Sequence, residues 1–319
     1  MLNKQITDAR AWTADTIDAS SDWYYPLSES YLSALDSEVQ KHADAISDLR
    51  VSDAIACAPC LQPVSEALQI GRGFAIIERL PVEHYTRDEA RAAYWMIGQC
   101  LGVPFEQNIE GTLLYDVRDT GRDVKSGARF SVTNAESSFH TDGAFGTQVP
   151  EIVGLLCIKT ARSGGRSQLI SACAVHNILH QQAPNVLNAL YSSFYFDRRG
   201  QYLPNEAPVK KTPVFSWDKQ TLMMRYLHYY IQVGHREAGV PLTPEQERAL
   251  QTVEDILKHP EMCVEFDLAP GQMLFTNNNW ILHNRTAFED HPDPDQRRHY
   301  VRLWLMQKDS VDGCIENRD

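Results

Sequence analysis

The sequence predicts a mainly β protein with peripheral helices. From about Leu113 onward, short apolar runs alternate with turn residues, a pattern typical of an antiparallel sandwich or barrel. Before that point, apolar residues recur mostly at helical spacing. The chain shows no internal repeat, low-complexity tract or obvious linker. We therefore expect one domain over residues 1–319, with a mainly helical part over 1–110 and a β core over 111–319 that carries a helical insert at about 172–260.

The first third of the chain is expected to be mostly helical. Its expected elements are a helix over residues 28–49, a short helix over 65–70, a strand over 74–80 and a helix over 87–101. Gly71 and Gly73 separate the short helix from the strand. Thr86 can cap the last helix, because Glu89 at its third position completes a capping box.

The remaining two thirds are expected to form short strands separated by two pairs of helices. The strands are expected over residues 113–117, 152–160, 167–171, 193–196, 214–217, 222–226, 263–268, 273–277, 280–283 and 299–306. The helices are expected over 172–181, 184–190, 229–238 and 243–257. Thr243 is expected to cap the last helix, since Pro244 suits a first helical position.

Composition limits the classes of partner. The chain has 43% hydrophobic residues, enough for a substantial core, and a net charge of −12. An acidic surface does not attract nucleic acid or an anionic membrane, so neither is expected as a partner. A small-molecule substrate is expected, because a local pair of arginines can still hold a small anion. A homo-oligomer is compatible with this composition.

Cysteine usage and the absence of an apolar span indicate a cytoplasmic protein. No stretch reaches the ~20 apolar residues needed to cross a bilayer, and residues 1–22 lack the features of a secretory signal. The seven cysteines are odd in number and scattered. Cys57 and Cys60 form a lone CxxC without a second pair at zinc spacing, so free thiols are expected there rather than a metal or redox site.

A histidine and a carboxylate stand two residues apart at His140 and Asp142. On an extended segment these side chains project to the same face, so both can reach one ion. His283, at the end of an apolar strand, is the best third ligand among the histidines. Two histidines and one carboxylate leave open positions on a metal, which is the ligand set of non-haem iron(II) oxygenases. The dyad alone is a weak signal, because HxD is common by chance.

Five further segments strengthen the prediction by their order and spacing. They are residues 138–142 (SFHTD), 163–167 (SGGRS), 270–275 (PGQMLF), 280–288 (WILHNRTAF) and 296–304 (QRRHYVRLW). Together they resemble the taurine dioxygenase-like family, which includes clavaminate synthase-like enzymes and uses iron(II), 2-oxoglutarate and dioxygen. The resemblance covers roughly the last 180 residues. It implies a double-stranded β-helix, or jelly-roll, core.

The resemblance also implies roles for single residues. His140, Asp142 and His283 match the metal triad, and Arg298 matches the arginine that pairs with the distal carboxylate of 2-oxoglutarate. Ser167 matches a hydroxyl position, usually threonine, that contacts the same co-substrate. Serine departs from the family pattern but keeps the hydroxyl.

Elementary chemistry supports the arginine assignment. A dicarboxylate suits the planar fork of arginine better than lysine. Arg298 and Arg302 are four residues apart on an expected strand, so they share one face with Tyr300. Arg298 is assigned to 2-oxoglutarate, and Arg302 to a substrate acid or to support of the co-substrate. The neighbouring Arg297 is expected to face solvent.

The substrate is weakly encoded. Segments before the triad and in the insert are expected to shape the pocket. The candidate substrate-binding residues are Arg302, Asn134, Ser137, Tyr115, Arg118 and Arg225. Arginines in this set favour a small anionic or zwitterionic metabolite such as an amino acid, and an intact Asp142 favours hydroxylation over halogenation. Two other classes stay open, a non-redox metal-dependent hydrolase and a metal-free jelly-roll binding protein.

Overall fold

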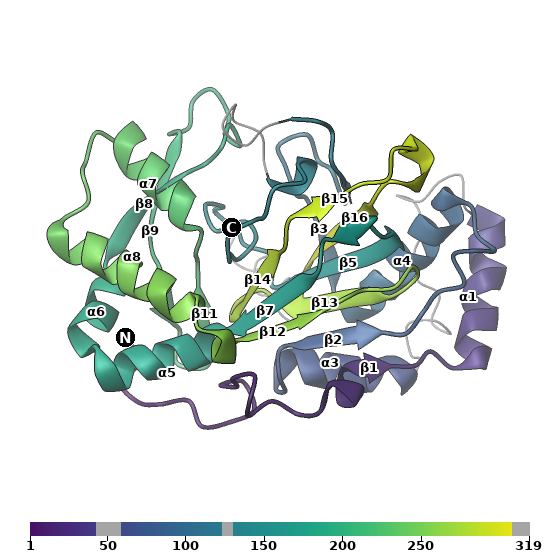
Figure 1. Cartoon of the computed structure of the whole chain (residues 1–319), viewed down its shortest axis with the longest axis horizontal. Helices are drawn as coiled ribbons and strands as arrows, with labels where there is room; N and C mark the ends of the chain where they lie inside the picture. Colours follow the sequence, from purple (N-terminus) through teal and green to yellow (C-terminus); the bar gives the residue numbers. More distant parts are fainter. Residues whose placement is uncertain (43–58, 123–129, 308–319) are drawn as a thin grey trace, which may run out of the picture.

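A computed structural model describes residues 1–42, 59–122 and 130–307 of the chain (Figure 1). The helices are α1 (Glu29–His42), α3 (Gln62–Gln69), α4 (Arg87–Leu101), α5 (Ala172–Gln182), α6 (Pro184–Leu190), α7 (His228–Glu237) and α8 (Pro244–Leu257). Short 3-10 turns lie at Ser20–Trp23, Pro59–Leu61, Phe130–Val132, Pro260–Met262 and Pro294–Gln296. Within these described ranges, no helix combines the length and the apolar character that crossing a membrane requires.

The larger sheet runs in the order β1-β2-β13-β5-β16-β3, with β4 also paired to β16. Its strands are β1 (Tyr24–Tyr25), β2 (Phe74–Ile77), β3 (Val103–Phe105), β4 (Leu114–Val117), β5 (Ile152–Lys159), β13 (Met273–Asn277) and β16 (His299–Met306). Strands β1, β2 and β3 come from the part of the chain expected to be mainly helical. That part therefore extends the main sheet as well as covering it.

A smaller sheet, β12-β7-β14, forms the second wall of the core. Its strands are β12 (Cys263–Phe266), β7 (Ser167–Ser171) and β14 (Ile281–Arg285), and a short pair, β6 (Ser163–Gly164) with β15 (Phe288–Glu289), lies beyond it. All pairings in this sheet are antiparallel. The core is the double-stranded β-helix that the sequence predicted.

The insert between β7 and β12 contains strands as well as helices. Helices α5 to α8 gather at one end of the molecule, at the left of Figure 1. They are accompanied by two hairpins, β8 (Ser193–Asp197) with β9 (Val209–Pro213), and β10 (Phe215–Trp217) with β11 (Leu222–Met224). Gly234 of α7 allows this helix to approach β8 closely, since a Cβ there would lie 2.4 Å from the carbonyl oxygen of Tyr195.

Helices at the opposite end, α1 and α4, cover the outer face of the larger sheet together with α3 (Figure 1). Buried apolar residues of α4, such as Trp95 and Ile97, pack with Leu303 and Leu305 of β16. Gly98 permits this packing, because a Cβ on it would lie 2.2 Å from the Leu303 side chain. The packing that holds β16 in place is important for the site, because several site residues lie on the inner face of this strand.

Most expected elements are observed. The bounds of β7, β13, β16 and α6 agree with the expectation, and the capping boxes at Thr86 and Thr243 are present. Helix α1 is described as far as His42, and the remainder of the helix expected over 28–49 lies outside the described residues. Cys57 also lies outside the described residues. Strand β2 ends at Ile77, three residues before the expected end. The amide of Leu80 instead donates a hydrogen bond to the carbonyl of Gly271.

Candidate metal and co-substrate site

His140 and His283 are held side by side by the backbone. The His140 amide donates to the carbonyl of His283 at 3.1 Å, and the His283 amide donates back to the carbonyl of His140 at 2.9 Å. Strand β14 in turn pairs with β7, which places His283 opposite Leu169. The two imidazole centroids are 4.3 Å apart. Residues 143 positions apart in the chain thus present their rings to one point.

The backbone at Asp142 is fixed by the buried Asn278. The Asp142 amide donates to Asn278 Oδ1 at 2.8 Å, and Asn278 Nδ2 donates to the carbonyls of Asp142 and Pro150, each at 2.9 Å. An amide side chain that makes these three bonds has one orientation. Asp142 therefore joins the two histidines from a defined direction.

The three side chains present their donor atoms to a common centre. Asp142 Oδ1 lies 3.5 Å from His140 Nε2 and 3.7 Å from His283 Nε2. His140 Nδ1 donates to the carbonyl of Ser138 at 2.7 Å, which leaves the Nε2 lone pair for an ion. Within the described residues, these three form the one group of three or more His, Cys, Asp or Glu residues whose ligand atoms all lie within 4.8 Å of one another. Two imidazoles and one carboxylate fit iron(II).

The electrostatics keep these ligands ready for a cation. Burial disfavours the charged form of Asp142, but the charge of Arg302 and the two histidines outweigh it, so the pKa of this carboxyl lies well below its ordinary value. Burial, together with the neighbouring His140, lowers the pKa of His283 to about 3. At neutral pH the site therefore offers a carboxylate and a neutral imidazole, which are the forms that bind metal.

Arg298 lines the same cavity as the triad, and one of its nitrogens is available to an anionic partner. Its side chain is buried, and Nη1 has no hydrogen-bond partner among the described residues. The guanidinium rests on aromatic rings, 3.8 Å from the centroid of Tyr300 and 5.2 Å from that of Phe288. A buried donor left unpaired is costly, typically ~1–3 kcal/mol, so a ligand carboxylate placed here would be strongly favoured.

A further arginine, Arg285, was not assigned from the sequence. Its Nη1 donates to the carbonyl of Thr133 at 3.1 Å, and Nη2 donates to the carbonyl of Ala135. Burial, followed by repulsion from Arg298, lowers its pKa to about 9. Arg285 thus ties β14 to the segment that leads into the metal site. Its position two residues after His283 on one strand was the available signal.

One cavity of about 130 Å³ contains the triad and most of the predicted site residues. It is lined by His140, Asp142, His283, Arg298, Ser167, Arg302 and Ser137 among the predicted residues. Ser131 and Tyr230 also line it, and so do Gln107, Phe130, Phe145, Leu227, Arg285 and Trp304, which were not selected from the sequence. Ser167 lies opposite Arg285 in the β7–β14 register, which turns it to the face that carries His283.

The other predicted substrate residues do not line this cavity. Asn134 is exposed, and its carbonyl accepts from the Phe288 amide. Arg118 is exposed and lines a separate cleft. Arg225 donates to the carbonyl of Gly146 at 2.9 Å, so it stabilises the turn that follows Asp142. Tyr115 lies beneath Arg302, with its ring centroid 5.2 Å from the guanidinium carbon. These four residues were selected for their places before the triad or in the insert, and this criterion did not identify side chains that line the cavity.

Arg302 has a different neighbour from the one expected. Its Nη1 lies 3.0 Å from Oδ2 and 3.2 Å from Oδ1 of Asp142, and its Nε donates to Gln107 Oε1 at 2.8 Å. Arg302 therefore pairs with the carboxylate of the triad while still facing the cavity. This pairing could not be read from the spacing of Arg298 and Arg302 alone.

Comparisons with known proteins agree with this geometry. Residues 58–304 match the family described as "Taurine catabolism dioxygenase TauD, TfdA family". The chain is 30% identical over 319 residues to the FR-33289 synthase of Streptomyces rubellomurinus, covering 96% of this chain and 91% of that protein.

Two solved structures share the fold. An asparagine oxygenase in complex with Fe(II), 2S,3S-3-hydroxyasparagine and succinate superposes with a TM-score of 0.66 at 18% identity, covering 89% of this chain and 93% of that one. The non-haem iron oxygenase OrfP in complex with Fe and α-ketoglutaric acid gives a TM-score of 0.65 at 16% identity, covering 92% and 96%.

These matches confirm the family and the jelly-roll fold that the sequence predicted. They also set aside a non-redox hydrolase and a metal-free binding protein, because the matched family consists of dioxygenases. The cofactors are iron(II), with 2-oxoglutarate and dioxygen as co-substrates. The chain belongs to the taurine catabolism dioxygenase TauD, TfdA family.

Proposed function

We propose that the enzyme hydroxylates a C–H bond of a small anionic or zwitterionic metabolite, an amino acid or a close analogue. The observation that carries this proposal is the presence of two arginines, Arg298 and Arg302, that line one small cavity together with the triad. One cation serves the co-substrate and the second is available to the substrate. The hydroxyasparagine bound in the similar asparagine oxygenase supports a substrate of this class.

Arg298 is proposed to receive the distal carboxylate of 2-oxoglutarate. Its Nη1 is buried without a partner, and the rings of Tyr300 and Phe288 hold the guanidinium in place. Ser167 lies on the same inner face of β7 and contributes a hydroxyl to the cavity. A planar fork and a nearby hydroxyl suit a carboxylate.

Arg302 is proposed to orient an acidic group of the substrate. Its Nε and Nη1 are engaged with Gln107 and Asp142, whereas Nη2 makes no hydrogen bond to any described residue. The cavity wall nearby contains Phe130 and Phe145, which suit an aliphatic chain and exclude water. A volume of about 130 Å³ fits a small metabolite better than a peptide.

His140, Asp142 and His283 are proposed to bind the iron. With 2-oxoglutarate and dioxygen, iron supplies the oxidising power for breaking a C–H bond, and the co-substrate leaves as succinate and carbon dioxide. The carboxylate of Asp142 would take one position on a bound iron and leave less room for a halide, which favours hydroxylation.

The test uses the purified chain with iron(II) and 2-oxoglutarate, first without oxygen. A weak visible charge-transfer band near ~500 nm is expected for an open iron(II) site of this kind. Amino acids and small zwitterions are then screened in air for stimulated succinate release and for a product heavier by one oxygen atom. A band together with stimulation only by uncharged compounds would contradict the substrate class, and no band with no succinate would contradict the whole proposal.

A further inference from the structure

The two oxygens of Asp142 have different surroundings. Oδ1 faces the two histidines, whereas Oδ2 accepts a hydrogen bond from the indole Nε1 of Trp304 at 2.8 Å. Arg302 Nη1 donates to both oxygens, at 3.0 Å to Oδ2 and 3.2 Å to Oδ1, so Trp304 is the neighbour that distinguishes them. Asp142 and Trp304 are only 5% and 7% exposed, so water does not compete strongly for this bond. The carboxylate is therefore turned by its neighbours so that one oxygen points at the metal position.

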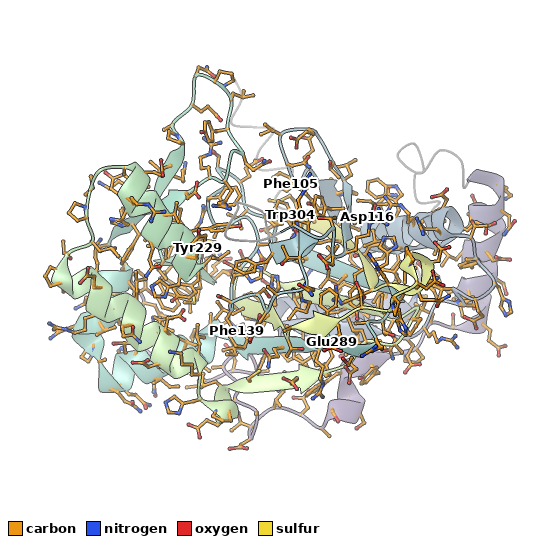
Figure 2. All side chains as sticks on the ribbon, turned by 45° about the horizontal axis from the view of Figure 1, so that its top comes forward. Phe105, Asp116, Phe139, Tyr229, Glu289 and Trp304 are labelled. Carbon is orange, nitrogen blue, oxygen red and sulfur yellow. The ribbon has the colours of Figure 1, made fainter. Side chains whose placement is uncertain are left out.

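Trp304 is itself fixed in place. It lies on β16 between two paired strands, opposite Phe105 of β3 and Val153 of β5. Its ring stacks on Phe105, with centroids 6.3 Å apart and an interplanar angle of 20°. The two residues are labelled next to each other in Figure 2. The indole N–H therefore has little freedom to turn away from Asp142.

We propose that Trp304 is a positioning residue that makes Asp142 a single-oxygen ligand. A carboxylate can bind a metal through one or both oxygens, and binding through both would occupy a position that 2-oxoglutarate or dioxygen needs. With Oδ2 held by Trp304, Oδ1 would be the oxygen that faces the ion. This inference depends on the iron site used in the proposed function, but not on the identity of the substrate.

The main test compares Trp304→Phe with Trp280→Phe. Trp280 is a matched control because it is 3% exposed and its Nε1 has no hydrogen-bond partner among the described residues. Both variants exchange an indole for a phenyl in the core, but only Trp304→Phe removes a hydrogen bond to Asp142. The measurements are the dissociation constants for iron(II) and 2-oxoglutarate without oxygen, and the charge-transfer band of the ternary complex.

Trp304→Phe is expected to weaken iron(II) or 2-oxoglutarate binding about tenfold or more, the usual scale for a lost partner of a metal ligand, and to shift or weaken the band. Trp280→Phe is expected to change neither constant more than about twofold, because it leaves the ligand's bonds intact. Equal losses in both variants would assign the effect to packing and overturn the proposal.

A second variant isolates the N–H group. Replacement of Trp304 by 3-benzothienylalanine keeps the shape of the indole but removes its donor, so folding is not at issue. The proposal requires this isostere to reproduce the binding and spectral changes of Trp304→Phe, and native behaviour of the isostere would overturn it. These readouts need no substrate, so a native chain that forms the band but hydroxylates no amino acid would count against the proposed function alone.

Discussion

The guanidinium carbon of Arg298 lies 3.8 Å from the centroid of the Tyr300 ring. Arg298 directly precedes β16 and Tyr300 is its second residue, at the point where the pairing with β5 shifts register between His299 and Tyr300. The ring gives the buried cation a favourable neighbour without neutralising it, since an aromatic face attracts a cation but carries no net charge. Burial lowers the pKa of Arg298, and an incoming carboxylate would relieve that penalty.

Arg298→Ala is expected to raise the KM for 2-oxoglutarate by about tenfold to a hundredfold, because a charge-assisted bond to a buried cation is lost. Iron(II) affinity should change little, since Arg298 does not contact the triad. The measurement is succinate release against 2-oxoglutarate concentration. Arg297→Ala is the control, because that side chain is exposed one residue away. An unchanged KM in Arg298→Ala would remove the assignment.

His140→Ala is expected to abolish stoichiometric iron(II) binding, because it removes one of three ligands that share a centre. The measurement is metal content after anaerobic loading and desalting. His84→Ala, a change at an exposed histidine, should retain the native metal content. Retention of one iron per chain in His140→Ala would show that the triad is not the metal site.

Arg302→Gln is expected to have two effects, because Arg302 contacts a metal ligand and also lines the cavity. Loss of its charge should raise the pKa of Asp142 toward the ordinary value, which leaves the carboxylate ionised at neutral pH, and should strengthen iron(II) binding because a neighbouring positive charge is removed. It should also raise the KM for an acidic substrate by about tenfold or more. Titrations of metal and substrate separate the two effects. Arg118→Gln, outside the cavity, should show neither.

The buried His176 is expected to make the fold sensitive to acid. Burial, followed by the nearby His180, lowers its pKa to about 4 from an ordinary 6.5. As pH falls from about 6.5 toward about 4, the unfolded chain takes up this proton before the folded one, so stability present above that window is progressively lost. The fall in Tm between about pH 7.5 and about pH 5 should be smaller by a few degrees in His176→Gln than in the native chain. His84→Gln should fall as far as the native chain.

Gly234→Ala is expected to destabilise the insert. A Cβ at this position would lie within 2.4 to 2.6 Å of backbone atoms of residues 195 to 197, which cannot rotate away. Overpacking of this kind costs ~1–3 kcal/mol, more than the ~1 kcal/mol that alanine adds to a helix. Denaturant unfolding measures the change. Gln232→Ala, on the exposed side of α7, should leave stability nearly unchanged or slightly raised.

Strands with apolar runs between turn residues could be predicted well, and β7, β13 and β16 are examples. The strand β9 was missed because its sequence, VKKTP, is half-exposed and carries no apolar alternation. It exists because β8 supplies a pairing edge, which is a tertiary effect. The expectation for the insert therefore lacked one strand of the β8–β9 hairpin.

The grouping of the triad could be predicted because two of its members are two residues apart in a segment expected to be extended, and the third lies in an apolar strand. Gln107 and Trp304 were not predicted, although both touch the polar group around Asp142. Their roles depend on β16 lying beside β3 and on the fold that brings Asp142 to it. Spacing along one strand shows which residues share a face, but not which side chain from another segment they will meet.

The reciprocal backbone hydrogen bonds between His140 and His283 have a thermodynamic consequence. They hold two of the proposed ligands together through the backbone alone, and Asn278 does the same for the third. The free energy of metal binding is then not reduced by the entropy of ordering the chain. Iron(II) should therefore raise the melting temperature in proportion to the logarithm of its free concentration, as expected for a ligand that binds the folded chain and not the unfolded one.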